Sequence, residues 1–160
     1  MNELITIGIS DMKVTRSPGC LVTYALGSCV GICLYDSAAK LAGLAHIMLP
    51  HYTEHNGANR LKFADTCIPI MVDEMVKLGC LKSRLTAKIA GGAKMFQVPD
   101  ESALGNIGDR NVIAVRQTLK LMTIPIVAED VGKNFGRTVF FNAETGKVEV
   151  KSYTRELLTL

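Results

Sequence analysis

Apolar positions occur mostly in short runs or in alternation with polar ones, a pattern typical of strands. Most runs end at Ser, Gly, Pro or Asp, which are common turn residues. The predicted strands cover residues 4–9, 12–14, 20–25, 29–36, 40–48, 84–90, 124–129, 137–142 and 147–153. A short reversal separates 29–36 from 40–48, which predicts an antiparallel hairpin, and the last two strands are joined across 143–146 in the same way.

Two segments have helical spacing instead. The first covers residues 63–78, with Asp65 as the expected N-cap and Gly79 just past the helix end. Its apolar positions are 67, 68, 71, 75 and 78. The second covers residues 109–122, with Asp109 as its expected cap. Residues 50–57 and 96–108 are expected to be loops.

Eight or nine strands and two helices in a non-alternating order indicate an α+β fold. We expect a mixed or antiparallel β-sheet core in sandwich-like layers, with two main helices packed outside. The length of 160 residues suits one domain, which we assign to residues 1–160.

Composition narrows the class of protein. The chain is 48% hydrophobic and 21% charged, the balance of an ordinary globular domain. A net charge of +3 without a basic run, and the absence of Trp, give no support for nucleic-acid binding. No apolar stretch approaches the roughly 18 residues of a membrane span, and no secretory signal is visible, so we expect no membrane insertion. Five cysteines without a CxxC pair indicate free thiols in a reducing cytoplasm.

The most informative stretch is TYALGSCVG, residues 23–31, in which small residues surround Cys29. Gly27 and Gly31 lie two residues either side of it, so bulk is absent on both flanks, and a substrate has room to reach the sulfur. The plain alternative is a buried cysteine in a glycine-containing strand, because free Cys is among the most buried residue types. Both interpretations stay open on this stretch alone.

His46 is the candidate base for Cys29. If 29–36 pairs with 40–48 around a turn near 37–39, Cys29 and His46 fall opposite one another near the open end of the hairpin. Thr23 offers a hydroxyl or a carbonyl to orient the imidazole. The alternatives are a core histidine in an apolar strand and an ordinary strand threonine.

The backbone amides of Ser28 and Cys29 are candidate oxyanion donors, with Gly27 leaving space in front of them. For a Cys–His ion pair we expect a lowered thiol pKa at Cys29.

Three other kinds of site are poorly matched. Gly27-x-Cys29-x-Gly31 has the spacing of a nucleophile elbow, but that fold places its histidine much later, and none occurs after His55. Gly91-Gly92 before Lys94 lacks the spacing of a phosphate loop, so a tight turn beside the site is expected. A zinc signature is absent, and we expect no metal. The candidate metal ligands are Cys29, Cys33, His46, His51 and His55, and their spacing resembles no zinc site.

An ordered set of segments resembles the CheD family. In chain order they read TYALGSCVGICLYD, LAGLAHIMLP, FADTCIPIMVDEMVKLG, KIAGGAKMF, NIGDRN and GRTVFFNAETGKVEV, and they run from about residue 20 to residue 150. LGSCV alone is a weak signal, whereas the ordered set is specific.

The resemblance implies a chemoreceptor glutamine deamidase with papain-like chemistry and no cofactor, on a fold similar to the cytotoxic necrotizing factor toxins. The family's catalytic Cys, His and Thr match Cys29, His46 and Thr23. Implied partners are the cytoplasmic helical bundle of methyl-accepting receptors and the phosphatase CheC, which CheD stimulates. The alternative function is a docking module for CheC and receptors in which catalysis is secondary.

Overall fold

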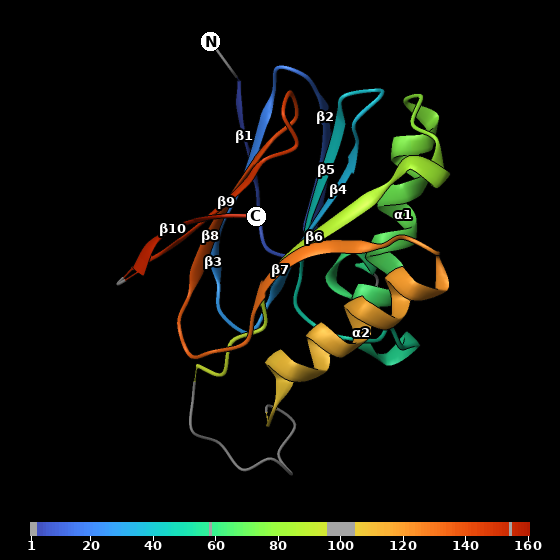
Figure 1. Ribbon diagram of the computed structural model, residues 1–160. Helices are drawn as coiled ribbons and strands as arrows, with labels where there is room; N and C mark the ends of the chain where they lie inside the picture. Colours follow the sequence, from blue (N-terminus) through green and yellow to red (C-terminus); the bar gives the residue numbers. More distant parts are fainter. Residues whose placement is uncertain (1–2, 58, 96–104, 154) are drawn as a thin grey trace.

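Ten strands form two five-stranded sheets in the computed structural model, which describes residues 3–57, 59–95, 105–153 and 155–160 (Figure 1). The first sheet contains, in spatial order, β1 (Leu4–Ile7), β3 (Cys20–Leu26), β8 (Arg137–Asn142), β9 (Val148–Ser152) and β10 (Arg155–Thr159). The second contains β2 (Asp11–Arg16), β5 (Leu41–Ile47), β4 (Val30–Asp36), β6 (Thr86–Gly91) and β7 (Ile126–Val131).

Both sheets are mixed. β1 runs parallel to β3 and β6 runs parallel to β7, whereas the other pairs are antiparallel. The predicted α+β class with sandwich-like layers is therefore confirmed, and so is the hairpin of β4 and β5. Strand β10 was not predicted, because RELLT lacks the alternation of a half-buried strand.

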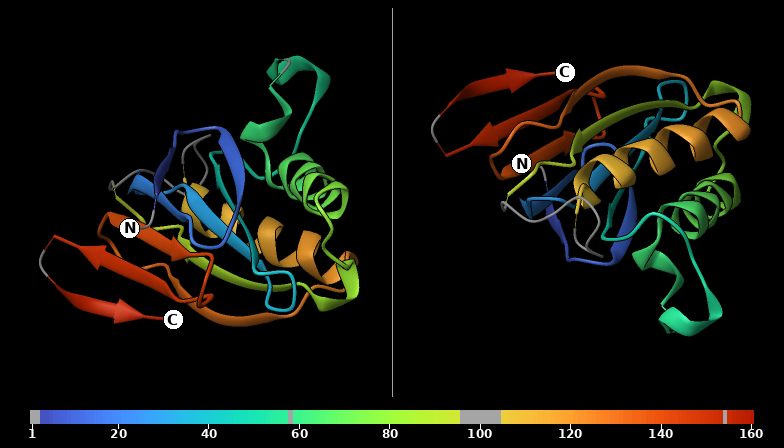
Figure 2. Two further views of the ribbon diagram at one scale, coloured as in Figure 1. Left: turned by 90° about the horizontal axis from the view of Figure 1, so that it is seen from above. Right: turned by 90° about the horizontal axis from the view of Figure 1, so that it is seen from below.

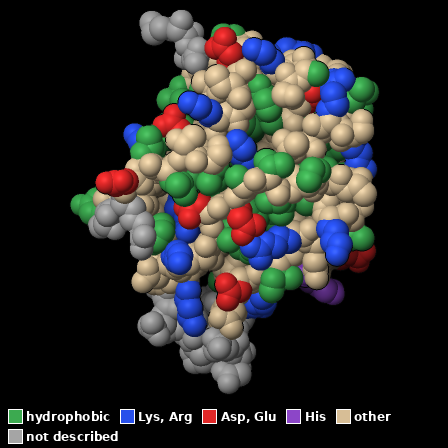
Figure 3. Space-filling view, in the orientation of Figure 1, with side chains coloured by type: hydrophobic (Ala, Val, Ile, Leu, Met, Phe, Trp, Pro, Cys, Tyr) green, Lys and Arg blue, Asp and Glu red, His purple; other side chains and the backbone are tan. Residues whose placement is uncertain are grey.

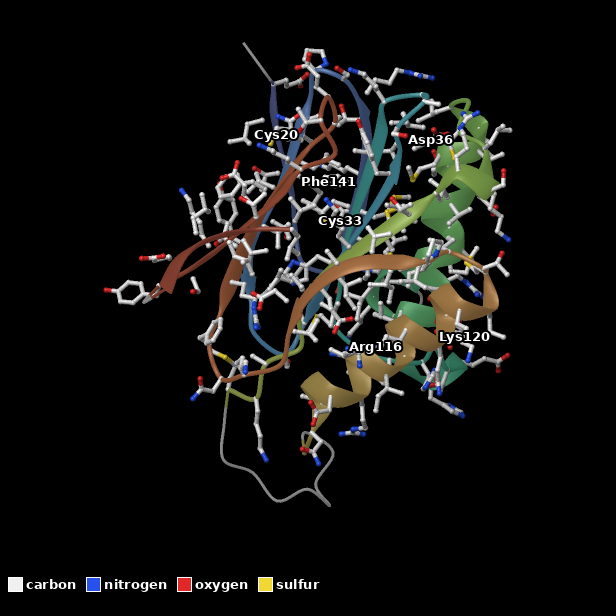
Figure 4. All side chains as sticks on the ribbon, in the orientation of Figure 1. Cys20, Cys33, Asp36, Arg116, Lys120 and Phe141 are labelled. Atoms are coloured by element: carbon white, nitrogen blue, oxygen red, sulfur yellow. The ribbon has the colours of Figure 1, made fainter. Side chains whose placement is uncertain are left out.

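Helices α1 (Ala64–Lys77) and α2 (Ile107–Leu121) cover the face of the second sheet that is turned away from the first (Figure 2). Arg116, labelled on α2 in Figure 4, forms an ion pair with Glu129 of β7 and so ties this helix to the edge of the sheet. Single 3-10 turns occupy Glu54–Asn56, Arg60–Lys62 and Lys82–Arg84. In the described part of the chain, no helix has the length and apolar character needed to cross a membrane.

The helix starts differ from the predicted ones. Phe63 precedes α1, so Asp65 lies inside the first turn, where its carboxylate accepts a hydrogen bond from the Tyr52 amide at 2.8 Å. Asn106 precedes α2 in the left-handed conformation, and Asp109 is likewise inside the first turn. Gly79 follows α1 with a positive φ of 111°, as expected for a residue just past a helix end. Residues 96–104 of the predicted loop lie outside the described residues.

Alternation along β5 separates two apolar layers. Leu41, Ala45 and Ile47 pack toward the helices, whereas Ala42 and Leu44 pack toward the first sheet. His46, which lies between Ala45 and Ile47 in the sequence, therefore projects between the two sheets. Cys33 and Phe141 belong to the same inter-sheet layer (Figure 4).

Charged side chains are interspersed on the surface. On the face drawn in Figure 3, Lys and Arg lie among Asp and Glu, and neither sign gathers over one element. This distribution agrees with the low net charge of +3 and offers no basic track for a phosphate backbone on that face.

Candidate active site

A bulge at the end of β3 shapes the segment that carries Cys29. The pairing of β3 with β8 shifts between Thr23 and Leu26, and Ala25 adopts a positive φ of 59°. Such a backbone is uncommon for a residue other than glycine, and bulges often redirect a chain next to a functional site. The chain then turns through residues 27–29 at one end of the sandwich, in the lower part of Figure 1.

Backbone hydrogen bonds fix this turn against the end of β6. The amide of Gly92 donates to the Cys29 carbonyl at 2.8 Å, and the amide of Ala93 donates to the Gly27 carbonyl at 2.9 Å. Gly91 has φ of 114°, and a Cβ there would lie 2.2 Å from the Cys29 carbonyl oxygen. Gly91 and Gly92 thus form the tight turn beside the site that the sequence predicted, and only glycine fits the first position.

The two flanking glycines have different surroundings. Gly27 lines the cavity that Cys29 borders, and a Cβ there would meet Met95 Cγ, on the same cavity, at 3.1 Å. Gly31 does not line it, because a Cβ there would meet Leu26 Cδ1 at 3.1 Å. The expected room for a substrate is therefore wrong for Gly31, and access to the sulfur is on the Gly27 side.

That cavity has a volume of about 360 Å³ and lies between three segments of chain. It is lined by residues 27–29 with Ala25, by residues 93–95, and by residues 106–109 at the start of α2. Gly27, Ser28 and Cys29 are therefore all placed at one pocket, and Cys29 is partly exposed. Most of the lining is apolar, which suits a small side chain more than a charged ligand.

Thr23 and His46 meet between the two sheets. The Thr23 hydroxyl oxygen lies 2.7 Å from His46 Nδ1, and neither residue has exposed surface. The same hydroxyl donates to the Ile7 carbonyl at 2.9 Å. A hydroxyl has one hydrogen to donate, so it must accept from Nδ1–H of the imidazole. His46 Nε2 is then the unprotonated nitrogen, and it has no hydrogen-bond partner among the described residues.

The predicted register of Cys29 and His46 is wrong by two residues. Gly31 is the residue opposite His46, and the ladder of β4 and β5 ends at Val30 and Ile47. Cys29 precedes β4 and packs against the inter-sheet layer, the side to which His46 projects. Cys29 is thus two residues from the strand partner of His46 and lies just beyond the end of the ladder.

Burial sets the charge state of both groups. It lowers the pKa of His46 to about 4, and it raises the pKa of the Cys29 thiol above its ordinary value, although a hydrogen bond from the Cys29 backbone acts in the opposite direction. The expected lowering of the thiol pKa is thus wrong for the protein without substrate. At neutral pH the pair is a thiol and a neutral imidazole.

Two polar residues that support the site were not predicted. Asn111 of α2 donates to the carbonyls of Ser28 and Met48, and the buried Arg137 donates to the Gly91 and Gly132 carbonyls while pairing with Asp130. For Asn111 a signal was present, since an amide stands in the buried stripe of α2 beside Val115 and Thr118. For Arg137 the strand pattern offered none.

Comparison with known proteins gives consistent matches. Residues 48–152 match the family described as CheD chemotactic sensory transduction. Proteins named "Probable chemoreceptor glutamine deamidase CheD" are similar along nearly their whole length. The one from Caldanaerobacter subterraneus subsp. tengcongensis is 53% identical over 94% of both chains, and one from Clostridium botulinum (strain Alaska E43 / Type E3) is 51% identical over 94% of this chain and 93% of its own. One from Desulfitobacterium hafniense (strain DSM 10664 / DCB-2) is 45% identical over 95% of each.

Proposed function

The chain belongs to the CheD family, and from this premise we propose that it is a chemoreceptor glutamine deamidase. The reaction converts a glutamine side chain of a methyl-accepting receptor into glutamate and releases ammonia. One observation carries the assignment of the site: a buried imidazole, oriented by Thr23, has an Nε2 with no hydrogen-bond partner among the described residues, on the side of the sheet where Cys29 borders a cavity. In this proposal Cys29 is the nucleophile, His46 the general base and acid, and Thr23 the residue that orients His46.

Acylation begins from the neutral pair. His46 Nε2 accepts the proton of the Cys29 thiol while the sulfur attacks the carboxamide carbon of the glutamine, which forms the S–C bond and turns the carbonyl oxygen into an oxyanion. The imidazolium then gives its proton to the amide nitrogen, the C–N bond breaks, and ammonia leaves. The product is a γ-glutamyl thioester on Cys29.

Hydrolysis reverses the roles. His46 Nε2 takes a proton from a water molecule, whose oxygen attacks the thioester carbon, and the S–C bond breaks as the proton returns to sulfur. Glutamate and the free thiol result. The backbone amides of Ser28 and Cys29 are proposed to stabilise the oxyanion in both steps, with Gly27 completing the turn that presents them.

A neutral resting pair suits this chemistry. Because burial disfavours both the thiolate and the imidazolium, proton transfer is coupled to attack on the substrate rather than completed before it. A Thr hydroxyl orients the imidazole without adding a negative charge, so the protonated form stays less stable than it would be beside a carboxylate. His46 therefore returns its proton readily to the departing nitrogen.

The proposed partners are the cytoplasmic helical bundles of chemoreceptors and the CheC phosphatase, with the protein acting in the cytoplasm. A second candidate function is a docking module for these partners. It is favoured by the 43% exposed Met95 side chain at the cavity and by the 48% exposed Tyr24 next to Ala25, which offer apolar surface beside the site. Stimulation of CheC by the Cys29→Ala protein would separate docking from chemistry.

Mass analysis of a receptor fragment tests the enzymatic proposal. The fragment is incubated with wild-type, Cys29→Ala and Cys33→Ala proteins, and each glutamine is examined for the amide-to-acid mass change. We expect conversion by the wild type and by Cys33→Ala, whose thiol is buried in the inter-sheet layer, and none by Cys29→Ala. Conversion at the normal rate by Cys29→Ala would refute the assignment of the nucleophile.

A further inference from the structure

We propose that Asn111 is a positioning residue that sets the separation of Cys29 from His46. The inference rests on the proposed deamidase mechanism, since it concerns the geometry of its two central groups. Asn111 lies on α2, far from both residues in the sequence, and its side chain has no exposed surface.

The amide nitrogen of Asn111 joins the two chain segments that carry the site. Nδ2 donates to the Ser28 carbonyl at 3.0 Å and to the Met48 carbonyl at 2.9 Å. Ser28 directly precedes Cys29, and Met48 follows His46 by two residues. Because both partners are carbonyl acceptors, the side chain must present its NH₂ group and use both hydrogens.

These two bonds lie where the strand ladder stops. The pairing of β4 with β5 ends at Val30 and Ile47, so backbone hydrogen bonds of that ladder do not reach Ser28 and Met48. The side chain of Asn111 bridges the two carbonyls just past the last pair and extends the connection by one rung. His46 is held inside the ladder by its pairing with Gly31, whereas Cys29 lies beyond the last pair, so the two bonds of Asn111 tie the Cys29 segment to the end of the strand that carries His46.

The helix that supplies Asn111 is closely fitted to the same region. A Cβ on Gly108 would lie 2.6 Å from both the Ala93 and Gly92 carbonyl oxygens, so the first turn of α2 is in tight contact with the turn that holds the Cys29 loop. Asn111 therefore projects from a helix whose distance to the site is itself fixed. A positioning group needs such a rigid support.

Packing alone does not account for an amide here. Asn111 Oδ1 is buried and has no hydrogen-bond partner among the described residues. An unsatisfied buried carbonyl is unfavourable, so an apolar residue of similar size would suit a purely packed position better. The amide is useful at this site for its two N–H donors.

The test compares Asn111→Leu, which keeps the volume and removes the donors, with Asn111→Ser and with the control Thr118→Val. Thr118 is buried two turns further along α2, and its hydroxyl donates to the Ala114 carbonyl of the same helix at 2.8 Å. Each change is made in wild-type and His46→Gln backgrounds. The measurements are kcat and KM for a receptor fragment, the rate of Cys29 alkylation by iodoacetamide, and the unfolding midpoint.

We expect Asn111→Leu to lower kcat by about tenfold or more with KM within about twofold, because small misplacement of a catalytic pair can cost on the order of a hundredfold. Cys29 alkylation should slow in the wild-type background and stay unchanged in the His46→Gln background, which is the sign of coupling between Asn111 and His46. Thr118→Val should leave kcat and alkylation unchanged.

Equal fractional slowing of alkylation in both backgrounds, or a kcat of wild-type size in a folded Asn111→Leu or Asn111→Ser protein, would overturn the proposal. The two proposals fail separately. If the alkylation rates of the variants show the expected coupling but the wild type leaves receptor glutamines intact, the deamidase proposal is refuted and the positioning role of Asn111 is kept.

Discussion

Thr23 Oγ1 and His46 Nδ1 lie 2.7 Å apart in the layer between the two sheets, and the Thr23 hydroxyl hydrogen points to the Ile7 carbonyl. This arrangement assigns the imidazole tautomer without a carboxylate. Strands β1 and β3 supply the acceptor and the hydroxyl from paired positions, since Ile7 is the register partner of Thr23. A chain of three polar groups thus leaves Nε2 as the only basic nitrogen of the ring.

Replacing Thr23 with Val should disable this arrangement while keeping the side-chain shape. The imidazole then has no acceptor for Nδ1–H, so both tautomers are populated and Nε2 is a base only part of the time. We expect kcat for receptor deamidation to fall by about a hundredfold, the lower end of what a positioned base contributes. Steady-state assays of Thr23→Val and Thr23→Ser provide the measurement, and Thr23→Ser, which keeps the hydroxyl, should retain most activity. Equal losses in both variants would contradict the tautomer argument.

The thiol of Cys29 should be protonated at neutral pH in the absence of substrate. Burial raises its pKa above the ordinary value, and the neighbouring imidazole, with a pKa of about 4, carries no charge that would counter this. The rate of Cys29 alkylation by iodoacetamide should therefore keep rising with pH beyond 9. Measurement in a Cys20→Ser background, by mass analysis of the labelled peptide, removes the other partly exposed cysteine.

A plateau of the alkylation rate already reached near pH 7 would show a thiolate and refute the neutral pair. Cys67 provides an internal comparison, because burial raises its pKa to about 12, with Asp11 adding to the effect, and it should stay unlabelled throughout.

Most of the fold was predictable from local patterns. The strands predicted at 137–142 and 20–25 and both helices follow from alternation or helical spacing, and a short reversal was enough to predict the hairpin of β4 and β5. Local signals do not contain the parallel pairing of β1 with β3, since it joins strands on either side of β2. That pairing brings Ile7 to Thr23, so the acceptor of the Thr23 hydroxyl was not predictable.

The sequence predicts which residues form the proposed site but not how they are arranged. Residue type and a family resemblance point to Cys29, His46 and Thr23, whereas the bulge at Ala25 and the end of the ladder at Val30 decide where the sulfur lies. Electrostatics was mispredicted for a physical reason. The expected thiolate–imidazolium pair would place a charge on His46. His46 is buried in the inter-sheet layer, and burial disfavours its charged form.

Gly91→Ala should be strongly unfavourable, whereas Gly8→Ala should be nearly neutral. At position 91 the new Cβ would lie 2.2 Å from the Cys29 carbonyl oxygen with φ of 114°, and at position 8 it would meet nothing within 4 Å. Because the obstacle at position 91 is the backbone of the loop that carries Cys29, we expect a loss of more than about 1 kcal/mol in unfolding free energy. The deamidation rate should fall by more than the loss of folded protein alone would cause. Urea unfolding and deamidation assays of the two variants test this, and normal activity in Gly91→Ala would contradict the close approach.

His46 should make stability depend on pH between about 6.5 and 4. Its pKa is lowered to about 4 in the folded protein, so the unfolded chain binds a proton more readily as the pH falls through this window. Folding stability is therefore full above about 6.5 and declines toward 4, by at most about 3 kcal/mol. Urea unfolding at a series of pH values should show the decline in the wild type and a flatter profile in His46→Gln. The same slope in both proteins would assign it to other groups.

Asp36 should make folding stability depend on pH in a separate, more acidic range. Burial raises the pKa of its carboxyl, but bidentate hydrogen bonds from Arg84 and bonds from the Ala39 and Leu81 amides outweigh burial and hold the pKa at about 2. Asp36 lies at the opposite end of β4 from Cys29 (Figure 4). A carboxyl with a lowered pKa contributes stability that is complete above its unfolded value of about 3.8 and is lost as the pH falls through 2.

Asp36→Asn should therefore lower stability at pH 7 and flatten its fall between about 4 and 2, while kcat at pH 7 stays close to that of the wild type because the carboxylate is remote from Cys29. Urea midpoints across this range, with Glu74→Gln on the exposed face of α1 as the control, measure the effect. Glu74 is 48% exposed and its ion pair with Lys77 spans 4.0 Å, so its removal should change little. Identical acid profiles for Asp36→Asn and the wild type would show that the Asp36–Arg84 pair does not control acid unfolding.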